Sequence, residues 1–156
     1  MRQATDLLRR FLVTAMTAAD VMTYRPVAVG PDDDLRTAAR LFVEHDVDSL
    51  PVEQEGALVG LLRRLDALQA LASDGDAPVR LPIGRTVASV MHRDPPTVGP
   101  DTPVPEVLAC MVATNARSLP VVVGALVIGI VTAGDLVRGL LTRRPGPAAV
   151  AVRVGV

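Results

Sequence analysis

Apolar residues recur three and four positions apart in two stretches of the chain, which is the spacing of one face of a helix. The apolar positions of these stretches are Leu35, Ala38, Ala39, Phe42 and Val43, and Val104, Val107, Leu108, Met111 and Val112. Each stretch therefore predicts an amphipathic helix. A short apolar stretch precedes each helix, at Val27–Val29 and Pro96–Val98, and is followed by the turn and helix-start signal Gly-Pro-Asp.

Two further apolar runs follow each predicted helix, and their lengths are typical of strands. The runs lie near Leu50–Glu53 and Leu58–Leu62, and near Leu119–Val122 and Leu126–Val131. A closing helix is predicted to begin near Arg64 and again near Thr132. The element order is therefore β-α-β-β-α, twice, and the fold class is α/β (α+β).

The two halves of this pattern are copies of one unit. Residues 17–71 align with residues 86–140 without a gap, and 17 of the 55 aligned pairs are identical. The sequence Ser-Leu-Pro-Val occurs in both copies, at residues 49–52 and 118–121. Self-similarity at a fixed spacing indicates a repeat architecture.

The repeat divides the chain into five parts. We predict an N-terminal helix in residues 1–16, a first repeat in residues 17–72, a linker in residues 73–85, a second repeat in residues 86–142 and a tail in residues 143–156. Neither repeat alone buries the face of its small sheet, so we expect the repeats to pack about a pseudo-twofold axis. Two similar clefts would form between them, and such interfaces are natural ligand sites.

Composition and charge argue against several classes of function. The chain has 156 residues, a net charge of −1 and only 2% aromatic residues, whereas nucleic-acid binding draws on basic and aromatic side chains. Cys110 is the only cysteine, which suits a reducing compartment. The longest apolar stretch, Val121–Val131, is too short to span a bilayer. We therefore expect a cytoplasmic protein that binds neither nucleic acid nor membrane.

The repeated pattern resembles a tandem pair of CBS (cystathionine-β-synthase) domains, also called a Bateman module. The resemblance covers about residues 17–142. Its most specific element is Gly129-Ile130-Val131-Thr132-Ala133-Gly134-Asp135, which matches the family ending Gly-h-h-[Ser/Thr]-x-x-Asp, where h is apolar. The resemblance implies a stand-alone regulatory module whose clefts bind an adenine nucleotide or S-adenosylmethionine. It also implies a homodimer that reports ligand binding to a target protein and requires no cofactor.

Thr132 and Asp135 are the leading candidates for ligand binding, and they allow two interpretations. Helix N-terminal N–H groups and a hydroxyl suit phosphate, and a carboxylate can accept both ribose hydroxyls. Alternatively, Thr132 caps the helix and Asp135 reaches back to it, which is a capping box. The family resemblance favours the ligand interpretation.

The resemblance also implies the other members of this site. The segment near Met22 and Val27, from the opening of the first repeat, would hold the adenine through backbone atoms and an apolar side chain. Asp48 would lie at the edge of the cleft. Arg117 stands where the family often has a basic residue that reaches phosphate, although a solvated surface arginine is the plainer interpretation.

The first repeat departs from the family pattern. It keeps the acid as Asp66 but has Arg63 where the hydroxyl is expected, so the cleft is either purely structural or built for a different ligand or a longer phosphate chain. Met91 and Pro96 would form its adenine segment, where Pro96 lacks a backbone donor. We therefore predict that the Asp135 site binds first and more tightly, and that the first-repeat site is the weaker one.

The main alternative is a constitutive dimeric scaffold that binds a target protein without a small ligand. The missing hydroxyl in the first repeat and the proline at position 96 both favour it. No acid–base pair, nucleophile or metal-ligand spacing is visible in the sequence. We therefore expect neither an enzyme nor a metal site.

Overall fold

The computed structural model describes residues 16–72 and 84–142. In this part of the chain, each repeat contains the predicted helix, strand hairpin and closing helix, which confirms the fold class. The predicted N-terminal helix and tail, and nearly all of the linker, lie outside the described residues. No helix in the described part is both long and apolar enough to cross a membrane.

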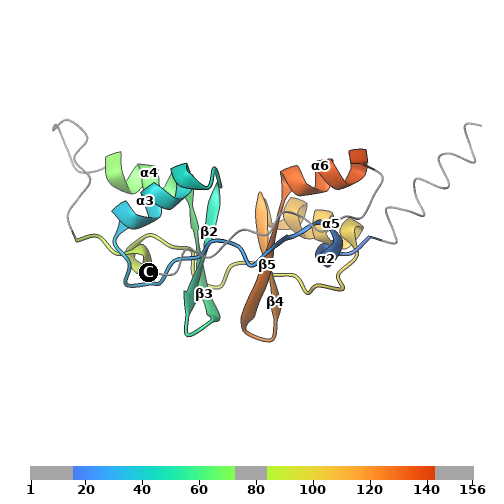
Figure 1. The fold of residues 1–156 in the computed structure, drawn as a ribbon, viewed down its shortest axis with the longest axis horizontal. Coiled ribbons are helices and arrows are strands. Elements are labelled where there is room, and N and C mark those ends of the chain that lie inside the picture. The colour runs from blue at the N-terminus through green and yellow to red at the C-terminus, as the bar shows by residue number, and fades with distance from the viewer. Residues whose placement is uncertain (1–15, 73–83, 143–156) are drawn as a thin grey trace, which may run out of the picture. The chain divides into compact units, whose positions relative to one another are not determined.

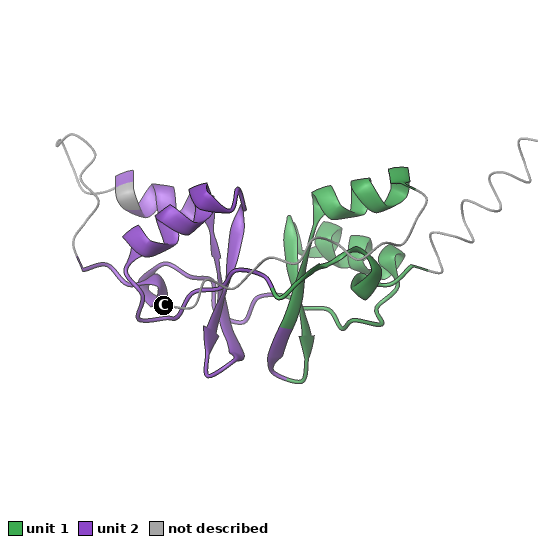
Figure 2. Cartoon of the chain, viewed as in Figure 1, with its two compact units in different colours: residues 1–25, 96–124, 128–151 green, residues 26–95, 125–127, 152–156 purple. Residues whose placement is uncertain are grey.

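The chain divides into two compact units, which Figure 2 colours separately. Unit 1 comprises residues 1–25, 96–124 and 128–151, and unit 2 comprises residues 26–95, 125–127 and 152–156. Neither unit therefore coincides with one sequence repeat. Each unit combines most of one repeat with the opening segment of the other.

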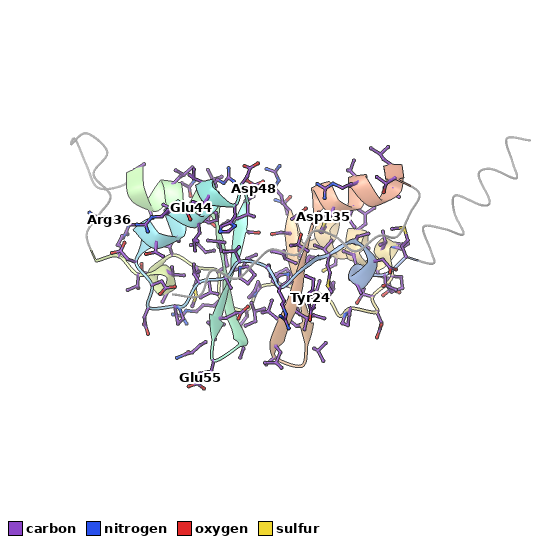
Figure 3. The ribbon with its side chains drawn as sticks, in the orientation of Figure 1. Tyr24, Arg36, Glu44, Asp48, Glu55 and Asp135 are labelled. Carbon is purple, nitrogen blue, oxygen red and sulfur yellow. The ribbon has the colours of Figure 1, made fainter. Side chains whose placement is uncertain are left out.

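Unit 2 contains two helices and a strand hairpin (Figure 1). Its elements are α3 (Leu35–Glu44), β2 (Ser49–Gln54), β3 (Ala57–Arg63), α4 (Arg64–Ala72) and the short 3-10 helix η1 (Val87–Ser89). Helix α3 begins after Asp34, whose carboxylate accepts a 2.8 Å hydrogen bond from the backbone N–H of Arg36. The hairpin turns at Glu55 and Gly56, and Figure 3 labels Glu55 at this turn. Both residues have positive φ angles, 53° and 82°, as a tight two-residue hairpin turn requires.

Unit 1 repeats this arrangement (Figure 1), with the short helix α2 at the repeat position of η1 and one additional short strand, β1. Its elements are α2 (Ala18–Val21), β1 (Thr23–Tyr24), α5 (Val104–Thr114), β4 (Ser118–Val123), β5 (Leu126–Thr132, of which residues 126–127 belong to unit 2) and α6 (Ala133–Thr142). Strand β4 pairs with β5, and the short strand β1 pairs antiparallel with β5. Strand β5 is therefore flanked by strands from both repeats.

Backbone hydrogen bonds attach each opening segment to the body of the other repeat. Thr23 pairs with Ile130 in unit 1. At the matching positions in unit 2, the backbone N–H groups of His92 and Leu61 each donate to the other's carbonyl at 2.9 Å. Because both copies show the same attachment, the exchange of opening segments is a property of the repeat.

Small aliphatic side chains fill the core of unit 1, as the low aromatic content predicts. The core joins residues of the opening segment to residues of the second repeat. Its buried members are Ala18, Val21, Met22, Val98, Val104, Val107, Met111, Leu119, Val121, Val131 and Leu136. The opening segment of the first repeat is therefore part of the core of the second.

The first strand predicted for each repeat is wrong in extent. Of the predicted strand Val27–Val29, only Val29 makes a ladder contact, a parallel bridge to Val52, and Val98 makes the matching bridge to Val121. Turn residues follow each bridge directly, and Pro96 has no backbone N–H to donate. The apolar side chains are nevertheless buried as predicted, because Val29 is 4% exposed and Val98 is 8% exposed.

Gly129 allows the opening segment to approach β5 closely. A Cβ atom at this position would overlap Met22 Sδ and lie 3.1 Å from the carbonyl oxygen of Thr23. We expect Gly129→Ala to lower the free energy of unfolding by about 1–3 kcal/mol, as overpacking does, measured by urea denaturation. Gly134→Ala is the matched control, since a Cβ there would meet only the Thr132 hydroxyl oxygen, at 3.6 Å. A Gly129→Ala protein as stable as this control would contradict the packing described.

Candidate functional site

Asp135 is the buried acid at the start of α6, where β5 ends (Figure 3). It is 7% exposed. Its Oδ2 accepts hydrogen bonds from the backbone N–H and the hydroxyl of Thr132, both at 2.8 Å, and the Thr132 hydroxyl accepts the backbone N–H of Asp135 at 3.1 Å. These contacts form the capping box that the sequence allowed. They also fix the orientation of the carboxylate.

The second carboxylate oxygen of Asp135 is held less firmly. Its Oδ1 accepts one hydrogen bond from the Arg138 guanidinium, at 3.0 Å. The Arg138 side chain is 70% exposed, and exposed ion pairs of this kind contribute little to stability. Oδ1 can therefore exchange Arg138 for another donor at small cost.

Arg117 lies beside this helix start. Its carbonyl accepts a 2.9 Å hydrogen bond from the backbone N–H of Ala133, the first residue of α6. Its side chain is exposed, and within the described part of the chain it has no hydrogen-bond or ion-pair partner. A cation next to a helix N-terminus is suited to a bound phosphate.

Met22 completes the part of the predicted site that unit 1 contains. It is buried, and its side chain packs against Gly129 of β5. The structure therefore brings Met22 onto the strand that leads to Thr132 and Asp135. Val27 and Asp48 belong to unit 2, so their place in this site remains a prediction.

Asp66, the matching acid of unit 2, has different partners. Arg63 contacts both carboxylate oxygens, with Nε 2.6 Å from Oδ2 and Nη2 3.0 Å from Oδ1. The imidazole Nε2 of His92 lies 2.8 Å from Oδ2. The structure therefore brings the predicted residues Arg63 and Asp66 together. Met91 packs against Gly60 of the same unit. Pro96, the remaining predicted residue, belongs to unit 1.

The residue that directly precedes β2 or β4, next to each helix start, carries opposite charges in the two units. In unit 2 the position of Arg117 is occupied by Asp48, whose Oδ1 lies 3.5 Å from Nε of Arg64. Nε of Arg64 also donates a 2.9 Å hydrogen bond to the carbonyl oxygen of Val47, and this contact holds the loop that follows α3. The matching residue of the second repeat is Ala133. The second repeat therefore presents an exposed cation, without a partner among the described residues, where the first presents a paired acid.

His92, Arg138 and Arg64 are members of these clusters that the sequence did not identify. His92 lies 26 residues from Asp66 in the sequence, so local spacing does not connect the two. The alignment of the repeats could have located it, since His92 directly follows Met91 in the exchanged opening segment. Arg138 could have been found from its position three residues after Asp135 on a helix.

The surroundings of Asp66 shift its pKa. Burial raises the pKa of this carboxyl, but the hydrogen bonds from Arg63 and His92, together with their charges, outweigh burial and hold the pKa below its ordinary value. A lowered folded-state pKa means that the cluster stabilises the fold fully above the unfolded-state pKa, near 4. That stability is lost as the pH falls through the lower folded-state value.

We expect the Asp66 carboxyl to titrate below pH 3.8, its ordinary value, when followed by carboxyl carbon chemical shifts in NMR. Replacing Arg63 with alanine removes the leading favourable contact, so the pKa should rise in the variant. The unfolding free energy that Asp66→Asn removes should correspondingly be largest above pH 4 and shrink at lower pH. An Asp66 pKa that Arg63→Ala leaves unchanged would contradict the assigned contact.

Comparison with known proteins identifies the family. Residues 18–73 and 87–142 match the CBS domain, so the chain belongs to the CBS domain family with two tandem copies. The CBS domain-containing protein YhcV of Bacillus subtilis is 32% identical over 120 residues, which cover 75% of this chain and 80% of YhcV.

Two solved structures share the fold closely. The CBS domain pair of protein MJ0100, in complex with 5′-methylthioadenosine and S-adenosyl-L-methionine, is 29% identical with a TM-score of 0.70, and the match covers 79% of this chain and 94% of that one. CBSX2 of Arabidopsis thaliana, in complex with AMP, is 31% identical with a TM-score of 0.68, over 81% of this chain and 97% of that one. Both are CBS-pair structures that contain adenosine compounds.

Proposed function

We propose that this protein is a regulatory module that binds an adenosine-containing ligand at the Asp135 site and signals the binding to a partner protein. The observation that carries the proposal is the helix start at α6. A buried, oriented carboxylate, a hydroxyl and an exposed arginine lie together there, on Asp135, Thr132 and Arg117. The adenosine ligands of MJ0100 and CBSX2 support the same class of ligand here.

Each group has a defined role in the proposed complex. The ribose hydroxyls donate to Asp135 Oδ1 in place of Arg138, and these charge-assisted hydrogen bonds are stronger than neutral ones. The phosphate of a nucleotide lies at the start of α6, with Arg117 as its counter-charge. Met22 supplies an apolar surface for the adenine, with Val27 and Asp48 expected at the edge of the site.

A thermal-shift panel tests the proposal, with AMP, ADP, ATP, S-adenosylmethionine, cyclic di-AMP and NADH. A ligand at 100 times its dissociation constant adds about 2.7 kcal/mol of stability. For a domain of this size, the melting temperature rises by roughly 2–4 °C per kcal/mol. We expect at least one adenosine ligand to raise it by several degrees. A folded, nucleotide-free protein that responds to none of them would contradict the proposal.

The second candidate is a scaffold without a small ligand. It is favoured by the internal contacts of Asp135, whose two carboxylate oxygens both have protein partners. Under this alternative, the Thr132–Asp135 pair is a helix cap and the protein acts through its surface alone. The ligand panel distinguishes the two candidates. In either case the role is regulatory rather than catalytic, and we place the protein in the cytoplasm.

We further propose that the protein forms a homodimer. Apolar side chains are exposed at matching positions of the two repeats: Val43 and Val112 are 81% and 75% exposed, and Leu68 and Val137 are 54% and 56% exposed. Both units expose these apolar side chains at the same positions, on α3 and α5 and on α4 and α6. Contact of such side chains with water is unfavourable. Exposed apolar patches of this kind mark interaction surfaces.

We expect the double variant Leu68→Lys/Val137→Lys to be monomeric by light scattering under conditions in which the wild type is a dimer. Two buried ammonium groups would destabilise the interface, whereas substitutions at exposed positions change the stability of a single chain by only about 0.5 kcal/mol. Gln54→Lys, at an exposed position of the β2–β3 hairpin, is the control. A wild type that is monomeric, or a double variant that stays dimeric, would count against this surface.

A further inference from the structure

Arg63 occupies the place in unit 2 that Thr132 occupies in unit 1. Both residues are the last of a strand, β3 or β5, and both stand three positions before the acid that begins the next helix. Thr132 contacts one carboxylate oxygen of Asp135 and leaves the other to an exposed side chain. Arg63 instead covers both oxygens of Asp66.

We propose that Arg63 is the specificity-determining residue that closes the first-repeat site, because its guanidinium occupies both carboxylate oxygens of Asp66 and leaves neither to accept the ribose hydroxyls of an adenosine ligand. The inference rests on the proposed function, since it concerns the second copy of the same site. It assigns one ligand to each chain of the wild type.

The contacts of Asp66 explain why a ligand does not simply displace Arg63. A paired guanidinium and carboxylate with two parallel hydrogen bonds is among the stronger polar contacts in proteins. His92 adds a third contact from the exchanged opening segment. The lowered pKa of Asp66 is consistent with a carboxylate whose charge is already compensated. By contrast, a ligand at Asp135 has to displace only one contact, from the exposed Arg138.

The same comparison defines what an opened first-repeat site would accept. Asp48 stands in unit 2 where unit 1 has Arg117, and it is already paired with Arg64. An added phosphate would therefore meet an acid instead of an exposed cation. The opened site should accept an uncharged or cationic adenosine compound and reject AMP.

Isothermal titration of Arg63→Thr tests this inference, with 5′-methylthioadenosine as the uncharged probe and AMP as the anionic one. The variant recreates the Thr-x-x-Asp spacing of residues 132–135. We expect wild type to bind one equivalent of either probe per chain. Arg63→Thr should bind two equivalents of 5′-methylthioadenosine and still one of AMP. The double variant Arg63→Thr/Asp66→Ala should return to one equivalent of both.

Four outcomes separate this inference from the proposed function. Wild type that already binds two equivalents would overturn the closed site, and this measurement needs no variant to fold. An Arg63→Thr protein that is folded by circular dichroism and still binds one equivalent of 5′-methylthioadenosine would also overturn it, while leaving the proposed function intact. Wild type that binds none while Arg63→Thr binds one would support the inference and contradict the Asp135 site. If neither protein binds either probe, both the closed first-repeat site and the proposed function are wrong.

Discussion

Replacing Asp135 with alanine is expected to abolish the stabilisation that an adenosine ligand gives the wild type. The variant loses the only carboxylate at the start of α6, and with it the acceptor for both ribose hydroxyls. Hydrogen bonds to a charged group contribute about 1.5–3 kcal/mol each, so the dissociation constant should rise at least about 100-fold. The measurement is the ligand-dependent shift in melting temperature, repeated by calorimetric titration.

Asp66→Ala is the matched control for this prediction. It removes the acid at the same position of the other repeat, and its carboxylate is already occupied by Arg63 and His92. Ligand binding should therefore persist in Asp66→Ala. Because the Asp135 carboxylate is also part of the capping box of α6, where it accepts the backbone N–H of Thr132, the alanine variant should lose about 1 kcal/mol of stability without ligand, so shifts are compared within each protein. Binding that depends on Asp66 and not on Asp135 would reverse the assignment.

Val21→Asp is expected to destabilise the second repeat, although Val21 belongs to the first. Val21 is 7% exposed and lies in the core that contains Val104 and Leu136. Close packing with α6 is also visible at Gly139, where a Cβ would lie 2.9 Å from Val21 Cγ1. An unpaired carboxylate in this core should cost roughly 3–5 kcal/mol, which is a large fraction of the 5–15 kcal/mol that typically stabilises a protein.

Urea denaturation gives the size of this effect, and NMR resonances give its location. We expect amides of α5, β4 and α6 to lose their native shifts or hydrogen-exchange protection first. Val123→Asp is the control, because Val123 is 53% exposed at the end of β4, outside the surface proposed for the homodimer, and its substitution should change the stability by less than about 0.5 kcal/mol. If Val21→Asp affects the resonances of residues 26–72 and leaves those of α5 and α6 unchanged, the opening segment of the first repeat does not pack in the core of the second.

The sequence predicted most of the secondary structure because its periodicity is strong and occurs twice. The helical spacing from Leu35 to Val43 and the strand-length runs beside Pro51 and Pro120 were each supported by a second copy. Turn residues such as Gly56 and Gly124, both with positive φ, limited the positions at which the strands could end. Local signals of this kind determine elements well.

Periodicity alone could not predict the exchange of opening segments, because pairing between distant segments leaves no local signal. Only the family resemblance placed the segment near Met22 beside Asp135 and the segment near Met91 beside Asp66. The contact between Asp66 and His92 has the same origin, since it exists only because the opening segment of the second repeat lies on the first. The strands predicted at Val27 and Pro96 were too long, because an apolar run indicates burial and does not establish a ladder of hydrogen bonds.

A titration of the nucleotide-free protein with AMP, followed by amide chemical shifts in NMR, tests the central claim most directly. The predicted result is a saturable shift of the amides of Met22–Arg25, Arg117 and Gly129–Asp135, and smaller changes around Arg63 and Asp66. No saturable change, or changes confined to residues outside these segments, would contradict a ligand site at Asp135.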